Sequence, residues 1–199
     1  MAPGGYSQGL HEIGDGLFAY LQPDGGWGLS NAGLVTGAGS SMLIDTLFDL
    51  RGAREMLDAL AKITAEAPIG AAVNTHGNGD HCFGNQLLPA GIPIHATRAA
   101  EAEIRAAPPA VVASLEQASD SPAWQVFWAR TFGRFDFADV EPRAPTELFD
   151  GRVELSVAGR ALEIVVNVET LYREFDAARS APPPPVLFVA MAEWSARHS

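Results

Sequence analysis

Short runs of apolar residues near the start of the chain predict three β-strands. The runs cover residues 17–22, 31–36 and 41–45, and glycine-rich segments at 23–26 and 37–40 separate them. Such segments are typical of turns, because glycine tolerates backbone shapes that other residues avoid. The chain is therefore expected to open as a β-meander.

The period of the apolar positions then changes to that of a helix. Across residues 49–63, Ala53, Met56, Leu60 and Ile63 recur at spacings of three and four, which is typical of an amphipathic helix. We expect this helix to cover one face of the sheet that the meander begins.

Beyond Pro68 the pattern alternates between strand and helix. Strands are predicted at 69–74 and 92–96, and a helix at 97–106 with Thr97 as its N-cap. Because proline cannot donate a backbone hydrogen bond, Pro93 predicts that the strand at 92–96 is short or lies at a sheet edge. The alternation indicates an α/β fold with helices on at least one face of the sheet.

The remaining elements are a helical segment at 111–129 interrupted at Pro122, a strand at 146–149, and two strands within 152–166 with a turn at 158–160. A short helix at 168–178, a polyproline segment at 182–185 and a terminal helix at 186–197 complete the prediction. Six aromatic residues of mixed spacing either join the core or form a lid over a pocket, and the usual burial of aromatic side chains favours the core; they are Trp124, Phe127, Trp128, Phe132, Phe135 and Phe137.

Composition and charge narrow the classes of function. The chain has 199 residues, of which 47% are hydrophobic, enough for one sizeable core. A formal net charge of −11 and the absence of any basic run argue against nucleic acid or an anionic membrane surface as a partner. Residues 1–16 lack the features of a secretory signal and the longest apolar stretch is too short to span a bilayer, so we expect a cytoplasmic protein. A single cysteine, Cys82, excludes an intrachain disulfide and a zinc site made only of cysteines.

The segment from Asn74 to Cys82 carries the candidate chemistry. His76, Asp80 and His81 fall within six positions directly after a predicted strand, and imidazole and carboxylate groups are ligands of zinc and similar cations. Gly77 and Gly79 allow this loop to fold tightly. Metal binding is therefore favoured over a coincidental polar loop, and three neighbouring residues are expected to fix the loop through hydrogen bonds, namely Asn74, Thr75 and Asn85.

This segment resembles the H-x-H-x-D-H signature of the metallo-β-lactamase superfamily, and residues 43–46 (LIDT) resemble the strand-ending aspartate motif of that family. The resemblance extends from about Leu10 to Leu162. It implies the αββα sandwich of the family, with His76 as a ligand of a first metal and Asp80 and His81 as ligands of a second. It further implies hydrolysis by a metal-bound hydroxide, with Asp80 as the catalytic residue that orients the water or moves its proton, and Asp45 as a structural brace behind the loop.

Two departures from the family pattern change what can be expected. Asn78 stands where the second histidine usually stands, and an amide oxygen is a poorer zinc ligand than imidazole. One branch of the superfamily has a similar motif, N-T-H-x-N-G-D-H-C-x-G-N, so Asn78 predicts a weakened first metal position or a single-zinc site built from His76, Asn78, Asp80 and His81.

The second departure lies downstream. The later Gly-x-x-His-Thr, Gly-Asp and Gly-His motifs are missing, and after His81 only His95 and His198 remain. We interpret His95 as a core or surface residue and His198 as part of a fraying terminus. Residues 164–175 resemble the closing segment of longer members, which suggests an internal deletion: a front half at 1–163 joined to a helical tail at 164–199, and thus an incomplete sandwich.

Two hypotheses for function follow. In the first, the chain is a metal-dependent hydrolase acting on an ester, thioester, lactone or amide bond of a small-molecule substrate. In the second, it is a catalytically impaired remnant or truncated form that binds a metal or a protein partner without turnover. Loss of part of the second sheet would expose apolar surface and so predicts a possible homodimer. Cys82 is expected to be a buried small residue rather than a zinc ligand.

Overall fold

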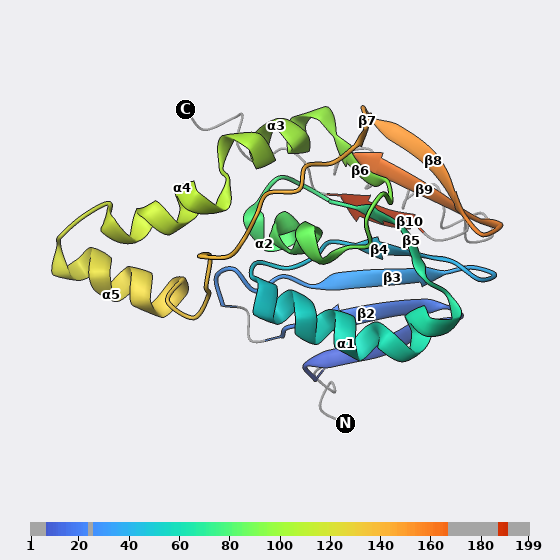
Figure 1. Ribbon diagram of the computed structural model, residues 1–199, viewed down its shortest axis with the longest axis horizontal. Helices are drawn as coiled ribbons and strands as arrows, with labels where there is room; N and C mark the ends of the chain where they lie inside the picture. Colours follow the sequence, from blue (N-terminus) through green and yellow to red (C-terminus); the bar gives the residue numbers. More distant parts are fainter. Residues whose placement is uncertain (1–6, 24–25, 167–186, 191–199) are drawn as a thin grey trace, which may run out of the picture.

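A computed structural model describes residues 7–23, 26–166 and 187–190 of the chain. Figure 1 shows a two-layered β-sandwich with helices along one side and a helical arm that extends away from it. The larger sheet has seven strands in the order β1 to β7, and the smaller has the order β10-β9-β8. The described residues thus form the front part of the expected αββα sandwich, with one helical layer on the side of the larger sheet, and the sandwich is incomplete as predicted.

The larger sheet begins with the predicted meander. Strands β2 (Leu17–Leu21), β3 (Ala32–Thr36) and β4 (Ser41–Ile44) pair in an antiparallel manner, and β5 (Ile69–Val73), β6 (Ile94–Thr97) and β7 (Glu147–Phe149) continue the sheet in parallel. An additional strand, β1 (Gly9–Gly14), pairs with β2 at the sheet edge. Its half-exposed side chains do not alternate cleanly, which is why the sequence pattern did not predict it.

The strand predicted at 92–96 is short, as one of the two alternatives had it, with four residues in β6, but it does not lie at a sheet edge. Strand β6 has neighbours on both sides, because β5 and β7 both pair with it. Pro93 precedes the strand and contributes only its carbonyl oxygen, which accepts a hydrogen bond from Ala72 N at 3.0 Å. Proline at this position therefore removes no hydrogen bond from the ladder.

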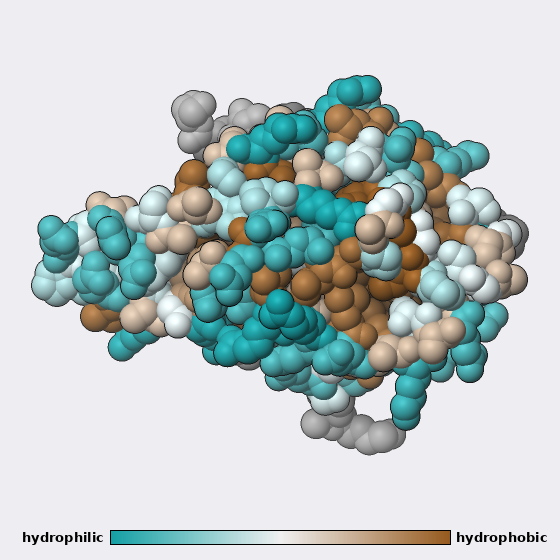
Figure 2. Space-filling model, in the orientation of Figure 1, coloured by the Kyte–Doolittle hydropathy of each residue, from teal (hydrophilic) through white to brown (hydrophobic). Residues whose placement is uncertain are grey.

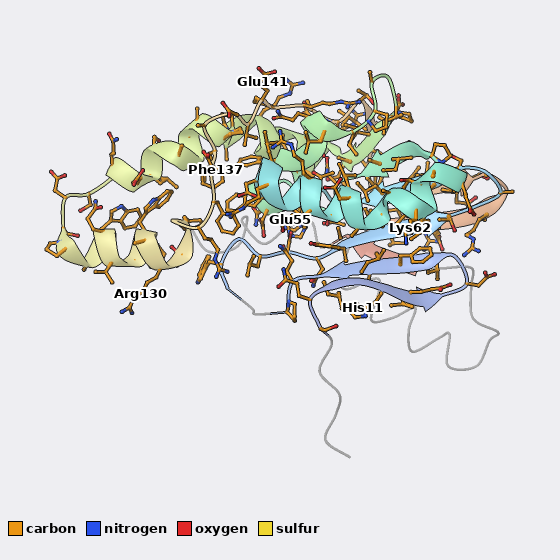
Figure 3. All side chains as sticks on the ribbon, turned by 60° about the horizontal axis from the view of Figure 1, so that its bottom comes forward. His11, Glu55, Lys62, Arg130, Phe137 and Glu141 are labelled. Atoms are coloured by element: carbon orange, nitrogen blue, oxygen red, sulfur yellow. The ribbon has the colours of Figure 1, made fainter. Side chains whose placement is uncertain are left out.

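Helix α1 (Leu50–Glu66) covers the outer face of the larger sheet, as Figure 1 shows. Asp49 caps its first turn by accepting a hydrogen bond from Gly52 N at 2.8 Å, and Met56 and Leu60 are buried in the core beneath it. Glu55 and Lys62 lie on the opposite, solvent-facing side (Figure 3), where Figure 2 shows mostly hydrophilic side chains. The amphipathic helix predicted from the spacing is thus confirmed, with bounds shifted by up to three residues.

The smaller sheet covers the other face of the larger one. Strands β8 (Arg152–Val157) and β9 (Arg160–Val166) form the predicted hairpin, and their Val157, Leu162 and Ile164 pack against Val35 and Met42. The apolar surface from which we predicted a homodimer is therefore partly covered by this hairpin. The homodimer stays a prediction.

The predicted terminal helix at 186–197 is wrong for its described part. Residues Leu187–Ala190 form strand β10, which pairs in parallel with β9. A short apolar run such as LFVA fits a buried strand or a buried helix equally well by period, so only the tertiary context separates the two. The predicted helix at 168–178, the polyproline segment at 182–185 and His198 lie outside the described residues. The proposed junction between residues 163 and 164 lies within β9.

Two proline residues begin helices of the arm. Helix α4 (Pro109–Ser114) is followed by a short 3-10 helix (Leu115–Gln117) and by α5 (Pro122–Thr131), and Pro109 and Pro122 each occupy the first turn. Proline is well tolerated there because the backbone N–H groups of a first turn have no partner within the helix. The predicted interruption at Pro122 is therefore the start of α5.

The aromatic cluster divides between the core and the surface. Trp128 and Phe137 are buried, whereas Phe127 is 39% exposed on the arm. Figure 3 shows Phe137 at the junction of the arm and the body, while Arg130 points away from α5.

Among the described residues, no helix is long and apolar enough to cross a membrane.

Candidate metal centre

The candidate metal loop connects β5 to α2 (Gly79–Cys82), a helix of one turn. The segment predicted as a loop thus ends in a helical turn, which carries Asp80 and His81. The carbonyl of Asn78 accepts the backbone N–H of His81 at 2.9 Å, which closes the turn. Further along, α3 (Arg98–Ala106) begins at its predicted N-cap Thr97 and packs beside the loop.

Three of the four predicted ligands come together. Each of His76, Asp80 and His81 offers one ligand atom, and these three atoms all lie within 4.8 Å of one another. The two imidazole rings are 3.8 Å apart between centroids, and His81 Nε2 lies 3.5 Å from Asp80 Oδ2. Asn78 is exposed and lines the same cavity as His76 and Asp80, so its role as a weak ligand stays a prediction.

Asp45 lies behind the loop, where the sequence placed a brace. It is 3% exposed, and its carboxylate accepts hydrogen bonds from Thr75 N at 2.8 Å, Thr75 Oγ1 at 2.7 Å and His81 Nδ1 at 2.7 Å. Because Nδ1 of His81 is occupied by this contact, Nε2 is the ring atom left for a metal. A carboxylate that fixes the orientation of a histidine ligand in this way is common behind zinc sites.

Below the loop lies a buried network of amide side chains. Asn74 and Asn85 are 1% and 0% exposed, and each donates to the side-chain oxygen of the other, at 3.1 and 2.8 Å. Asn74 also donates to the carbonyl of His81 at 3.0 Å, and Thr46 Oγ1 donates to Asn85 at 2.9 Å. The prediction that these residues form hydrogen bonds that fix the loop is therefore confirmed.

This loop lies within a segment that matches a known family. Residues 25–165 match the family model described as the metallo-beta-lactamase superfamily, which is well over half of the chain. The chain belongs to the metallo-β-lactamase superfamily. No curated protein sequence matches it.

Solved structures show the same fold. The chain is similar to the stereoselective inverting sec-alkylsulfatase Pisa1 from Pseudomonas sp., with 22% sequence identity and a TM-score of 0.57 over 78% of this chain and 27% of that chain. A double mutant of this sulfatase gives 21% identity with the same TM-score of 0.57 and the same coverage of 78% and 27%. A metallo-beta-lactamase from Pontibacter korlensis shares 13% identity at a TM-score of 0.49, over 80% of this chain and 71% of that one. The chain thus spans 27% of the length of the sulfatase.

The two histidines of this metallo-β-lactamase loop have opposite pKa shifts. Burial lowers the pKa of His76 below 6.5, and the nearby charge of His81 lowers it further, against opposing contributions from Asp45, Asp80 and Glu103. Burial also lowers the pKa of His81, but the hydrogen bond and charge of Asp45, together with Asp80, outweigh it and raise the pKa above 6.5. A neutral His76 has a lone pair available for a cation near neutral pH.

Cys82 does not join the three ligand residues. Its side chain is buried, and its Sγ contacts the carbonyl of Asn78 at 3.4 Å. Burial, followed by the charges of Asp45 and Asp80, raises the pKa of the thiol, so it stays protonated and is a poor ligand. The expectation of a buried small residue is confirmed.

His95 lies apart from the loop on β6, paired in register with Val73 and Glu147. Burial lowers its pKa despite the opposing charge of Glu147. Within the described ranges, His76, Asp80 and His81 form the one group of three histidine, cysteine or acidic residues that could hold a metal. The downstream ligands that the sequence lacks are therefore not replaced by another such group there.

A cavity of about 630 Å³ opens beside the loop. His76, Asn78 and Asp80 line one part of it, while Trp27 and Phe48 line another. This volume falls within the range of small-molecule sites in proteins, roughly 300–1,000 Å³. Nothing in the sequence indicated that Trp27 lines this cavity, because the β2–β3 connection and the metal loop come together only in the folded chain.

The residues present fit a zinc ion. Two imidazoles and one carboxylate are the donor set of many catalytic zinc sites, which hold the metal through three protein ligands and leave a fourth position for water or substrate. The lowered pKa of His76 favours the neutral form that such ligands need, and Asp45 orients the ring of His81 so that its Nε2 is left for a metal. Among the described residues, no second group of three such donors is present.

Proposed function

We propose that the chain is a metal-dependent hydrolase that holds one zinc ion with His76, Asp80 and His81, with Asn78 as a weak additional ligand. Its substrate is a small molecule with an ester, thioester, lactone or amide bond. The observation that carries this proposal is the set of three donors within 4.8 Å beside a cavity of about 630 Å³. Membership of the superfamily supports the reaction class.

The side chains divide the chemistry among them. When bound, a zinc ion would polarise the scissile carbonyl and lower the pKa of water to about 7, which makes water a nucleophile at neutral pH. Asp80 would orient the attacking water and accept its proton through a carboxylate oxygen. Asp45 keeps Nδ1 of His81 protonated, so that Nε2 points to the site.

A second candidate function is metal binding without turnover. It is favoured by the small number of donors, because His76, Asp80 and His81 are the whole ligand group found in the described residues. Such a chain would keep the metal yet lack the downstream metal ligands of the family pattern.

Hydrolysis by the zinc-loaded chain separates the two candidates. We expect cleavage of 4-nitrophenyl butyrate or a butyryl thioester to fall by about a hundredfold or more in Asp80→Asn, because a positioned proton acceptor contributes about that much. Asp150→Asn is the matched control, since Asp150 is 71% exposed and pairs with Arg98 outside the site. Equal, background rates in the wild type and in Asp80→Asn, with zinc still bound, would establish the second candidate instead.

A further inference from the structure

Building on the proposed function, we infer that the cavity beside the metal loop binds an uncharged, apolar part of the substrate and discriminates against substrates that carry a carboxylate or another anionic group there. The inference rests on two observations: an aromatic wall assembled from three separate segments, and two acidic residues that line the same cavity.

The aromatic wall consists of Trp27, Phe48 and Phe132, which all line the cavity. Trp27 comes from the β2–β3 connection, Phe48 from the β4–α1 connection, and Phe132 from the end of α5. The rings contact one another edge to face: Phe132 lies 6.4 Å from Trp27 and 6.1 Å from Phe48 between centroids. Segments distant in sequence thus converge on one apolar surface next to His76 and Asp80.

The wall leaves its outermost ring uncovered. Trp27 is 67% exposed, the highest value among the large hydrophobic residues that are exposed in the described structure. An exposed indole at the rim of a cavity gains from an apolar ligand that covers it, because apolar surface is then removed from water. This feature favours an aryl or alkyl group as the occupant.

Gly28 allows the β2–β3 connection to pack closely against Phe48. Its φ of 72° lies in the left-handed region, and a Cβ at this position would meet Phe48 Cδ1 at 2.6 Å. Glycine therefore lets the β2–β3 connection pass directly over Phe48 and presents Trp27 to the cavity. The position of the indole is set by this close approach as well as by its ring contacts.

The charges around the cavity are negative. Asp80 and Glu103 line it, and Glu103 Oε2 accepts a hydrogen bond from Gly77 N at 3.3 Å, which keeps this carboxylate beside the loop. Neither lysine nor arginine is present among the described residues that line the cavity. In the metal-free chain both carboxylates are therefore available to repel an anionic ligand.

Binding to the metal-free chain tests this inference without any turnover. The probes are N-butylbenzamide and 4-(butylcarbamoyl)benzoate, which differ by one carboxylate, and ligand-observed NMR titration gives both affinities. We expect the neutral amide to bind about tenfold more tightly, since like charges in a binding site cost roughly this much or more. Similar affinity for both probes, or tighter binding of the carboxylate, would overturn the inference.

Two substitutions assign the effect to the named residues. Trp27→Ala should weaken binding of the neutral amide by about tenfold, as expected for loss of a large apolar contact, whereas Ile13→Ala, an exposed residue of β1, should leave it unchanged. Glu103→Gln should improve binding of the carboxylate alone, whereas Glu101→Gln on the same helix should not. An unchanged affinity in Trp27→Ala, or unchanged discrimination in Glu103→Gln, would contradict the proposed walls.

The outcome is independent of the hydrolase proposal. A chain that discriminates between the probes but hydrolyses no ester would overturn only the proposed function. Conversely, a zinc-dependent hydrolase that binds both probes equally would overturn only the inference about the cavity.

Discussion

The floor and the rim of the candidate site are built in different ways. The floor is a buried polar network in which Asp45, Asn74 and Asn85 are each at most 3% exposed and hydrogen bonded to their neighbours. The rim consists of aromatic side chains whose rings pack edge to face, and its outermost member, Trp27, is largely exposed. Directional bonds fix the floor, whereas the rim depends on non-directional apolar contact.

This difference has consequences for how each part tolerates change. A buried polar group that loses its partner keeps the full cost of its desolvation, so substitutions in the floor should strongly affect stability and metal binding. An exposed ring buries little apolar surface, so its removal costs the fold little stability. Substitutions at the rim should therefore affect ligand binding and leave the fold intact. The following experiments test this contrast, beginning with the largest expected effect.

Asn85→Ala should cause the largest loss of stability. It removes the partner of Asn74 Oδ1 and leaves Thr46 Oγ1 and the carbonyl of Arg143 without the donor or acceptor that Asn85 supplies. We expect the free energy of unfolding to fall by about 3 kcal/mol, because each unsatisfied buried polar group costs roughly 1–3 kcal/mol. Urea denaturation measures this value, and a loss below about 1 kcal/mol would show that the network contributes little.

Asp45→Asn should weaken zinc binding by about 10- to 100-fold, the usual effect of removing a carboxylate behind a histidine ligand. The substitution conserves shape but removes the charge that orients His81. Competition with a chromophoric chelator gives the affinity, and Asp150→Asn serves as the control. An affinity equal to that of the wild type would contradict the role of Asp45 as a brace.

The two histidines should titrate on opposite sides of pH 6.5 in the metal-free chain. NMR titration should place the pKa of His81 above 6.5 and that of His76 below it. In Asp45→Asn the pKa of His81 should decrease, since burial then acts without its main opposing charge. The same direction for both histidines would contradict the electrostatic account of the loop.

The linked effect on stability follows from these signs. The contribution of His81 is fully present below pH 6.5 and is lost as the pH rises through its raised folded-state pKa. The contribution of His76 is present above pH 6.5 and is lost as the pH falls through its lowered pKa. Unfolding free energies of His81→Gln and His76→Gln across this range separate the two effects.

Trp27→Ala should have the smallest effect on stability. Its indole is 67% exposed and forms ring pairs with Phe127 and Phe132. We expect a loss of less than about 1 kcal/mol, since an aromatic pair contributes about 0.5–1.5 kcal/mol when well packed. Denaturation under the conditions used for Asn85→Ala provides the comparison, and similar losses in both variants would erase the distinction between floor and rim.

The metal loop could be predicted well from the sequence because its signals are local. His76, Asp80 and His81 lie in one short segment, and the glycines between them announce a tight loop. The resemblance to the metallo-β-lactamase superfamily then indicated Asp45, which lies 30 residues before Thr75 but at the end of the neighbouring strand. The meander was likewise predicted from short apolar runs between glycine-rich turns, and helix α1 from its period of three to four residues.

The rim and the sheet edges were not predictable in the same way. Trp27 and Phe132 are more than 100 residues apart in the printed sequence, and only packing of the arm against the β2–β3 connection brings them together. Strand β10 has an apolar run without a decisive period, so its pairing with β9 determines its structure. Strand β6 is interior in spite of Pro93, because its partner β7 follows about 50 residues later.

The most direct test of the metal centre is the amount of zinc that the purified chain retains, measured by elemental analysis after removal of weakly bound ions. We predict close to one zinc per chain in the wild type, and little in His76→Ala and Asp80→Ala while both variants remain folded. A folded wild-type chain that retains no zinc would contradict the account, because its three donors would then not form a metal site.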